Sequence, residues 1–171
     1  QGEITRLENG EAFHMSNTPT YELWCDGSYR GNSKKHGGPI GGGFVMHENR
    51  TGKQESFSYL FNSLSNSRRH GSMIAEIRAV TAALNEAPQS EHVRIYNDNQ
   101  GVVQALQNRE LGETPSQKGG YALHLAFRRA VLAMDRHSHV SFRQRKRDTT
   151  MMQKAHNLAS VATRSPEADA R

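Results

Sequence analysis

Two extended segments joined by a short turn constrain the fold of this chain most strongly. Residues 41–48 and 53–60 both have the residue types of strands, and the Asn-Arg-Thr-Gly sequence between them, residues 49–52, is typical of a hairpin turn. A third, alternating run at residues 21–26 precedes them. Because strands joined by short turns pair antiparallel, these segments predict a three-stranded antiparallel meander.

Helix and strand patterns alternate through the rest of the chain. Apolar residues at helical spacing predict a helix from Ser72, its expected cap, to about Ala87, before Pro88. The further elements expected are a strand at residues 92–97, helices at 100–108 and 121–134, a strand at 138–145 and a helix at 150–163. A meander followed by this alternation indicates the α/β class, with a mixed five-stranded sheet and flanking helices.

The length of 171 residues suits one domain with a substantial core. We expect a flexible or loosely docked lead-in at residues 1–19, the folded domain at 20–164 and a polar tail at 165–171. No apolar run approaches the ~20 residues that a membrane span needs, so we expect no membrane partner. The one cysteine, Cys25, excludes an internal disulfide and favours a cytoplasmic or otherwise intracellular protein; within a strand it is expected to be a small buried residue.

Three acidic residues stand at the ends of predicted elements. Asp26 ends the first strand, Asp98 follows the strand at 92–97, and Glu76 lies one turn into the helix that begins near Ser72. If the two strands are neighbours and the helix begins beside them, the three carboxylates meet at one edge of the sheet. Carboxylates that crowd together repel one another, and a divalent cation with hard oxygen ligands is the usual resolution.

Each of these acids also has an ordinary structural explanation. Asp26 before Gly27 is a common turn pair, Glu76 is placed to interact with the helix dipole, and Asp98 is placed to be an N-cap. Taken singly, each explanation is more probable than a metal site. Their joint placement, at two strand ends and one helix start, favours the metal site instead.

The net charge of +5 indicates a polyanionic partner and says nothing about the fold. Basic residues gather in four runs, of which residues 143–147 (Arg-Gln-Arg-Lys-Arg) are the densest. A solvated surface explains any single run. Together with a carboxylate cluster, the runs suggest that basic groups hold a nucleic acid while the acids hold metal.

Three motifs in order resemble those of the ribonuclease H family. The first is Asp-Gly-Ser at residues 26–28 with Gly31 and Asn32, and the second is Ala75-Glu76 with the alanines that follow. The third is Tyr-Asn-Asp-Asn-Gln at residues 96–100. The resemblance extends from about Tyr21 to Thr163, and the expected order of elements is also similar to that of the family.

The resemblance implies hydrolysis of the RNA strand of RNA–DNA hybrids with two Mg²⁺ ions, Mn²⁺ being a possible substitute. Asp26, Glu76 and Asp98 match the family's metal ligands. Asn32 matches a position that contacts the minor groove of the hybrid. Asn99 and Gln100 are expected near a bound backbone, although turn and N-cap roles explain them equally well.

The last helix departs from the family pattern. A fourth catalytic carboxylate usually precedes a Leu-Ala pair there, and this chain has His156 at that position, in Ala-His-Asn-Leu-Ala. This form is similar to a branch of the superfamily in plant and retroelement-related proteins. His156 is either a neutral metal ligand that favours Mn²⁺, a donor beside the scissile phosphate, or the mark of a weakened second metal site. A histidine on the helix surface is the explanation if the helix turns away from Asp26.

Two further departures affect the substrate side. Ser72, Met73 and Ile74 stand where many members have an Asn pair that helps to recognise ribose hydroxyls. Asp148 stands near the position of a mobile histidine. It is either a displaced acid that reaches the metals or a loop carboxylate paired to a nearby arginine, and the second is the expected role. These departures keep two alternatives open: a nucleic-acid-binding module with weak or no catalysis, and a nuclease that acts on another duplex.

Overall fold

The computed structural model describes residues 3–6, 12–15, 18–30, 38–61, 70–90, 92–112 and 120–164. Its strands are β1 (Glu3–Arg6), β2 (Ala12–Met15), β3 (Tyr21–Tyr29), β4 (Ile40–Glu48), β5 (Gln54–Phe61), β6 (Val93–Asn97) and β7 (Val140–Gln144). Its helices are α1 (Gly71–Glu86), α2 (Gln100–Asn108), α3 (Gly120–Met134) and α4 (Thr150–Arg164).

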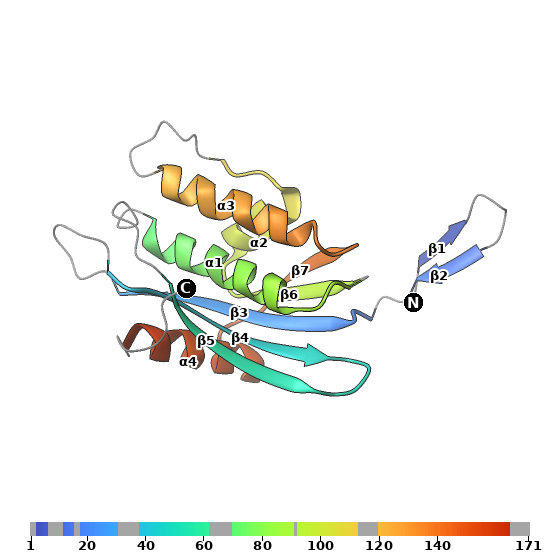
Figure 1. Ribbon diagram of the computed structural model, residues 1–171, viewed down its shortest axis with the longest axis horizontal. Coiled ribbons are helices and arrows are strands. Elements are labelled where there is room, and N and C mark those ends of the chain that lie inside the picture. The colour runs from blue at the N-terminus through green and yellow to red at the C-terminus, as the bar shows by residue number, and fades with distance from the viewer. Residues whose placement is uncertain are drawn as a thin grey trace.

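Five strands form one mixed sheet in the order β5-β4-β3-β6-β7. β3, β4 and β5 pair antiparallel, whereas β6 runs parallel to both β3 and β7. The meander and the mixed five-stranded sheet expected from the sequence are therefore confirmed. Helices α1 and α3 lie on one side of the sheet and α4 lies on the other (Figure 1).

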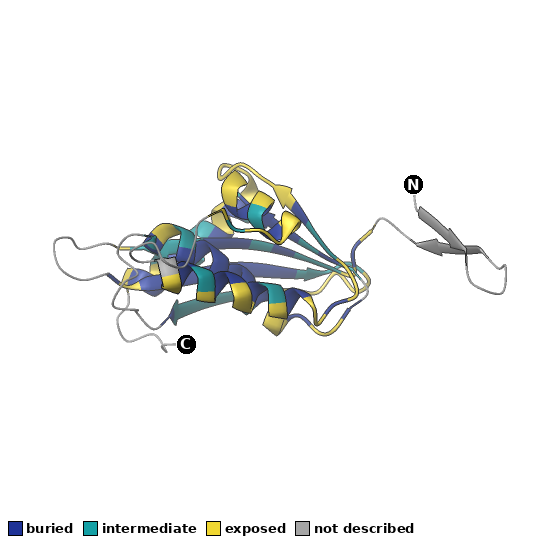
Figure 2. Cartoon of the chain, turned by 90° about the horizontal axis from the view of Figure 1, so that it is seen from above, coloured by how far each residue is buried: buried dark blue, intermediate teal, exposed yellow. Residues whose placement is uncertain are grey.

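The core lies where the helices meet the sheet. Leu23, Ile74 and Leu84 are among the side chains with no exposed surface, and they come from β3 and α1. Figure 2 shows buried residues on the helix sides that face the sheet and exposed residues on the outer sides. Apolar residues at period two in strands and at period 3.6 in helices produce this pattern, because each period places them on one face.

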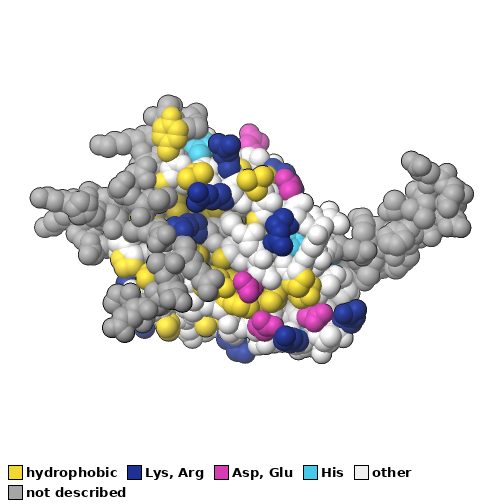
Figure 3. Space-filling model, viewed as in Figure 1, with side chains coloured by type: hydrophobic (Ala, Val, Ile, Leu, Met, Phe, Trp, Pro, Cys, Tyr) yellow, Lys and Arg dark blue, Asp and Glu magenta, His cyan; other side chains and the backbone are white. Residues whose placement is uncertain are grey.

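The side of α3 that faces solvent carries exposed apolar residues among basic ones. Tyr121, Leu125 and Leu132 are exposed by 69%, 41% and 68%. A hollow of about 420 Å³ beside them, between α1, α3 and β5, is lined by Arg78 and Arg129 as well as by apolar side chains. Figure 3 shows Lys and Arg side chains among hydrophobic ones on the face in view. None of the three acids identified from the sequence lines this hollow.

Strand β3 continues beyond the expected boundary. A turn was expected from Gly27 onward, but Gly27, Ser28 and Tyr29 remain in the strand and pair with residues 40–42 of β4. Gly27 is a glycine for a spatial reason: a Cβ there would lie 2.3 Å from the backbone of Ala75 and Glu76. The close approach of α1, and not a turn, therefore requires this glycine.

Other details also differ from the sequence-based expectations. Ser72 does not cap α1, which begins at Gly71. The N-cap residue is His70, and its side chain makes no capping hydrogen bond to the helix. Within residues 1–19, β1 and β2 pair antiparallel as a separate two-stranded sheet, although the sequence showed no strand period there. None of the helices in the described ranges is long and apolar enough to cross a membrane.

Candidate metal and nucleic-acid site

Asp26 lies in the middle of the sheet, on the face covered by α4. Only 1% of the residue is exposed. Its Oδ2 accepts a hydrogen bond from His156 Nδ1 at 2.8 Å, while its buried Oδ1 has no hydrogen-bond partner among the described residues. A carboxylate in such a place is costly unless something compensates its charge.

Glu76 reaches the same place from α1. Its Oε1 accepts a hydrogen bond from the backbone N–H of Gly27, a contact that the missing Cβ of Gly27 makes possible. The residue is 6% exposed, and its Oε2 is a second buried oxygen for which the described part of the chain offers no partner. Glu76 is therefore a buried residue of the sheet–helix junction, not a solvated acid at a helix start.

Asp98 follows β6 at the point where β6 and β3 separate, since their pairing ends at Trp24 and Tyr96. Asn97 bridges the gap with its buried side chain. Its Nδ2 donates to the carbonyl oxygen of Cys25 at 2.9 Å, and its Oδ1 accepts from the N–H of Asn99 at 2.8 Å. The sequence analysis assigned no role to Asn97. Its side chain is completely buried, and this burial becomes apparent only once the pairing of the strands is known.

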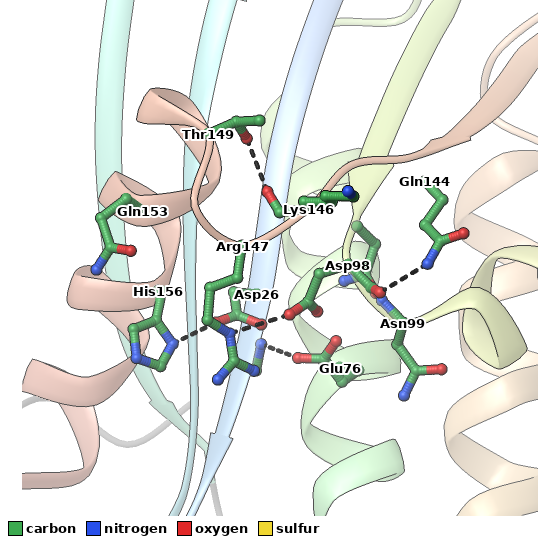
Figure 4. Close-up of polar contacts among 12 residues, drawn as sticks. Asp26, Glu76, Asp98, Asn99, Gln144, Lys146, Arg147, Thr149, Gln153 and His156 are labelled. Atoms are coloured by element: carbon green, nitrogen blue, oxygen red, sulfur yellow. Dashed lines mark hydrogen bonds and ion pairs between the residues drawn. The ribbon is translucent and has the colours of Figure 1, made fainter.

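The three carboxylates come together as expected, although Asp26 lies within β3 and not at its end. One oxygen from each of Asp26, Glu76 and Asp98 lies within 4.8 Å of the others, and Figure 4 shows the side chains converging. Burial raises the pKa of Glu76 well above its usual value, and the charges of Asp26 and Asp98 raise it further. The oxygen-only donor set and the two unpartnered oxygens fit a hard divalent cation.

His156 faces this cluster and does not turn away from it. Helix α4 approaches β4 closely enough for a Cβ at Gly43 to lie 2.4 Å from the backbone nitrogen of Ala159. The His156 side chain is 33% exposed and its Nδ1 points at Asp26. The ordinary explanation, a histidine on the helix surface away from the site, is therefore wrong.

Arg147 is a member of the site that the sequence analysis placed elsewhere. Its Nε donates to Asp98 Oδ2 at 3.0 Å, so Arg147 pairs with the metal-site carboxylate and not with its neighbour Asp148. Arg147 also lines a hollow of about 300 Å³ with Gly27, Ser72, Glu76, Asp98 and Asn99. The signal that could have found Arg147 is its place three residues after β7, which runs parallel to β6, the strand that precedes Asp98.

The expected substrate-binding residues have different outcomes. Asn32 lies outside the described residues. Asn99 is the N-cap of α2, since its Oδ1 accepts from the N–H of Val102 at 3.1 Å, and it lines the hollow as well. Gln100 is the exposed first residue of α2.

Basic and aromatic groups continue from the carboxylates along β6 and β7. Arg143, Arg145 and Lys146 are exposed. The Arg145 guanidinium lies 4.9 Å from the ring centre of Tyr96, which stacks on Trp24 at 4.8 Å. This arrangement places positive charge beside the site, as nucleic-acid backbones require. Cys25 is fully buried and its pKa is raised by that burial, which agrees with the expected structural role.

Comparisons with known proteins agree with this geometry. Solved structures with the same fold include the N-terminal RNase H domain of a Mycobacterium tuberculosis protein, 18% identical, with a TM-score of 0.63 over 86% of this chain and 98% of that one. RNase H1 of Halobacterium salinarum is 21% identical, with a TM-score of 0.64 over 83% of this chain and 96% of that one.

A third structure, LC11-RNase H1 in complex with an RNA/DNA hybrid, is 17% identical, with a TM-score of 0.58 over 84% of this chain and 96% of that one. LC11-RNase H1 was isolated from compost by a metagenomic approach. No match was found among curated protein sequences. A sequence model of the RNase H family matches residues 18–160, nearly the whole described domain. The chain therefore belongs to the RNase H family.

Proposed function

We propose that this protein is a metal-dependent endonuclease that hydrolyses the RNA strand of RNA–DNA hybrids. The observation that carries the proposal is the pair of buried, unpartnered carboxylate oxygens, Asp26 Oδ1 and Glu76 Oε2, beside Asp98. Membership of the RNase H family supports an endoribonuclease of that type, and the hybrid bound to LC11-RNase H1 supports the substrate.

Asp26, Glu76 and Asp98 would hold two divalent cations, Mg²⁺ or Mn²⁺. Such cations supply positive charge that stabilises the attacking and leaving oxygens of a phosphodiester. Glu76 must lose its proton to act as a ligand, and its raised pKa makes this harder than for a solvated glutamate. The Gly27 N–H opposes that effect by donating to the ionised carboxylate.

His156 acts through Asp26 in this proposal. Its Nδ1–H donates to Asp26 Oδ2, while Oδ1 is buried and has no hydrogen-bond partner among the described residues. A ring nitrogen that donates its proton to a carboxylate has no lone pair to offer a cation. His156 is thus a residue that positions the Asp26 carboxylate, and it is not itself a metal ligand.

The exposed basic groups would hold the substrate. Arg143, Arg145 and Lys146 lie on the strand and connection that lead to the carboxylates. Phosphate contacts from such residues give affinity that falls steeply with salt and carries little sequence preference. Asn99 at the rim of the hollow is placed to meet the strand that enters it.

The direct test is cleavage of a labelled RNA–DNA hybrid with Mg²⁺ and with Mn²⁺. Asp26→Asn should lower the cleavage rate more than about 100-fold while hybrid binding persists. Replacing a residue that only contacts a metal ligand already lowers metal affinity or activity about 10–100-fold, and Asp26 would be a ligand itself. Asp135→Asn is the matched control, since Asp135 is an exposed acid that pairs with Arg109 at 2.8 Å. A hybrid left intact by the unmodified protein in both metals would refute the proposal.

A second function is favoured by one observation, the histidine in place of the fourth carboxylate. With fewer acidic ligands, the fold could serve as a nucleic-acid-binding module with weak or no catalysis. That function predicts hybrid binding without cleavage and without heat on titration with Mg²⁺. Matched double-stranded RNA and DNA substrates in the same assay distinguish a nuclease that prefers another duplex.

A further inference from the structure

We propose that Arg147 holds Asp98 in the absence of a cation and is released, when a divalent cation binds, to contact a phosphate of the nucleic acid. This inference rests on the proposed metal-dependent function. It assigns to Arg147 a contact with substrate that depends on metal binding. The residue would link the two binding events at one site.

The backbone after β7 places Arg147 beside Asp98. The N–H of Arg145 donates to the carbonyl oxygen of Asn97 at 3.0 Å, which extends the β6–β7 pairing to the end of β6. Gln144 Nε2 donates to the carbonyl oxygen of Asp98 at 3.2 Å. The carbonyl oxygen of Lys146 then accepts from the Thr149 hydroxyl at 2.8 Å, which closes a turn around Arg147. Hydrogen bonds to main-chain carbonyl oxygens therefore fix the backbone on both sides of Arg147.

The side chain of Arg147 competes with a cation for the same carboxylate. Its Nε lies 3.0 Å from Asp98 Oδ2, and Asp98 supplies one of the three ligand atoms that converge within 4.8 Å. Figure 4 shows the Arg147 side chain extending from the β7–α4 connection to Asp98. A guanidinium so placed neutralises part of the negative charge that attracts a cation, so its removal should strengthen cation binding.

A released Arg147 would remain at the rim of the hollow. Its side chain is 58% exposed, whereas that of Asp98 is 15% exposed, so the arginine can move more freely than its partner. A guanidinium offers five donors in a planar fork that matches a phosphate with two parallel hydrogen bonds. Lysine keeps the charge but cannot make the paired contact.

Opposite changes in two affinities test the proposal. In calorimetry without nucleic acid, Arg147→Gln should bind Mn²⁺ or Mg²⁺ about three- to tenfold more tightly than the unmodified protein. In fluorescence anisotropy with Ca²⁺ and an uncut hybrid, the same variant should bind the hybrid about tenfold more weakly. The loss should be smaller in EDTA, where Arg147 remains paired with Asp98. Arg147→Lys should recover part of the hybrid affinity.

Arg145→Gln is the matched control. Arg145 belongs to the same connection and is exposed, but its guanidinium lies over Tyr96 and not on a carboxylate. This variant should leave cation affinity within about twofold and should weaken hybrid binding equally with and without cation. Circular dichroism melting checks that both variants fold.

The results separate this inference from the proposed function. If Arg147→Gln binds cations no more tightly than the unmodified protein, or loses hybrid affinity equally in EDTA and Ca²⁺, the role of Arg147 is wrong. If Asp26→Asn and Asp98→Asn bind cations as the unmodified protein does, the metal site itself is wrong. Both cation measurements are made without hydrolysis, so they do not depend on activity.

Discussion

Gly43 connects the packing of the sheet to the geometry of the site, and Gly43→Ala tests that connection. Gly43 pairs with Asp26 across β3 and β4 and lies under α4, the helix that carries His156. An added Cβ would lie 2.4 Å from the backbone nitrogen of Ala159, 2.6 Å from the carbonyl oxygen of Ala155 and 2.6 Å from Leu158 Cβ. Two of these atoms are helix backbone, so no side chain can move aside.

The magnitude follows from these distances. Ordinary contact begins at 3.4 Å, so α4 must move away by about 1 Å (3.4 − 2.4). Overpacking of this kind costs about 1–3 kcal/mol, and the reduced entropy of the unfolded chain returns about 0.4–1 kcal/mol. We expect a net loss of about 1–2 kcal/mol. A 1 Å shift would also lengthen the 2.8 Å contact between His156 and Asp26 beyond hydrogen-bonding distance.

Urea unfolding followed by circular dichroism measures the stability change. Gly112→Ala is the control, because no described residue lies within 4 Å of a Cβ there and Gly112 has no positive φ. Its expected change is below about 0.5 kcal/mol. The hybrid-cleavage rate of Gly43→Ala should fall as well, since His156 no longer holds Asp26. A Gly43→Ala protein as stable as the Gly112→Ala control, with an unchanged denaturant slope, would refute the reasoning.

Two further predictions concern the carboxylates. In EDTA at neutral pH, Glu76→Gln should raise the free energy of unfolding by about 1 kcal/mol, because it replaces a buried ionisable group with a neutral one that can still accept from Gly27. Because the pKa of Glu76 is raised, the folded state binds the Glu76 proton more tightly than the unfolded state does. The contribution of Glu76 to the free energy of unfolding is therefore present at low pH and is lost as pH rises through the folded-state pKa. The advantage of Glu76→Gln in urea titrations should therefore shrink as pH falls toward 4.5, and an advantage that is independent of pH would contradict this cause. His156→Asp would place a carboxylate oxygen where Nδ1 now lies, 2.8 Å from Asp26 Oδ2. The His156→Asp variant should be about 1 kcal/mol less stable without cation and should cleave the hybrid in Mg²⁺ at least about tenfold faster. His156→Asn is the neutral control. Equal cleavage rates for the two variants would show that a fourth carboxylate is not what the site lacks.

The elements of the fold could be predicted because their signals are local. The period of apolar residues and the turn residues located every strand of the large sheet and all four helices, and α2 begins and ends at the predicted residues. Asp26, Glu76 and Asp98 were identified from their places in the predicted elements, and the family resemblance selected the same three residues. Their convergence followed once β3 and β6 were neighbours in the sheet. The two strands β1 and β2 were missed because their sequence shows neither the apolar period of a strand nor that of a helix.

Contacts between distant segments could not be predicted in the same way. Gly27 has the sequence context of a turn, and only its 2.3 Å approach to the α1 backbone shows why it is glycine. Arg147 stands next to Asp148 in the chain, but β6 and β7 are parallel neighbours and bring Asp98 within 3.0 Å of its guanidinium. In both cases the neighbour in space is tens of residues away in the chain.

The sequence by itself determined the class of fold, the approximate positions of its main elements and the resemblance to the family, since each depends on residue types at short spacing. The tertiary structure alone decided the environment of each charge. Burial left Asp26 and Glu76 with unpartnered oxygens, the fit of α4 against Gly43 brought His156 to Asp26, and the β6–β7 pairing brought Arg147 to Asp98. Electrostatic energies depend on distance and solvent exposure, and both are properties of the folded chain.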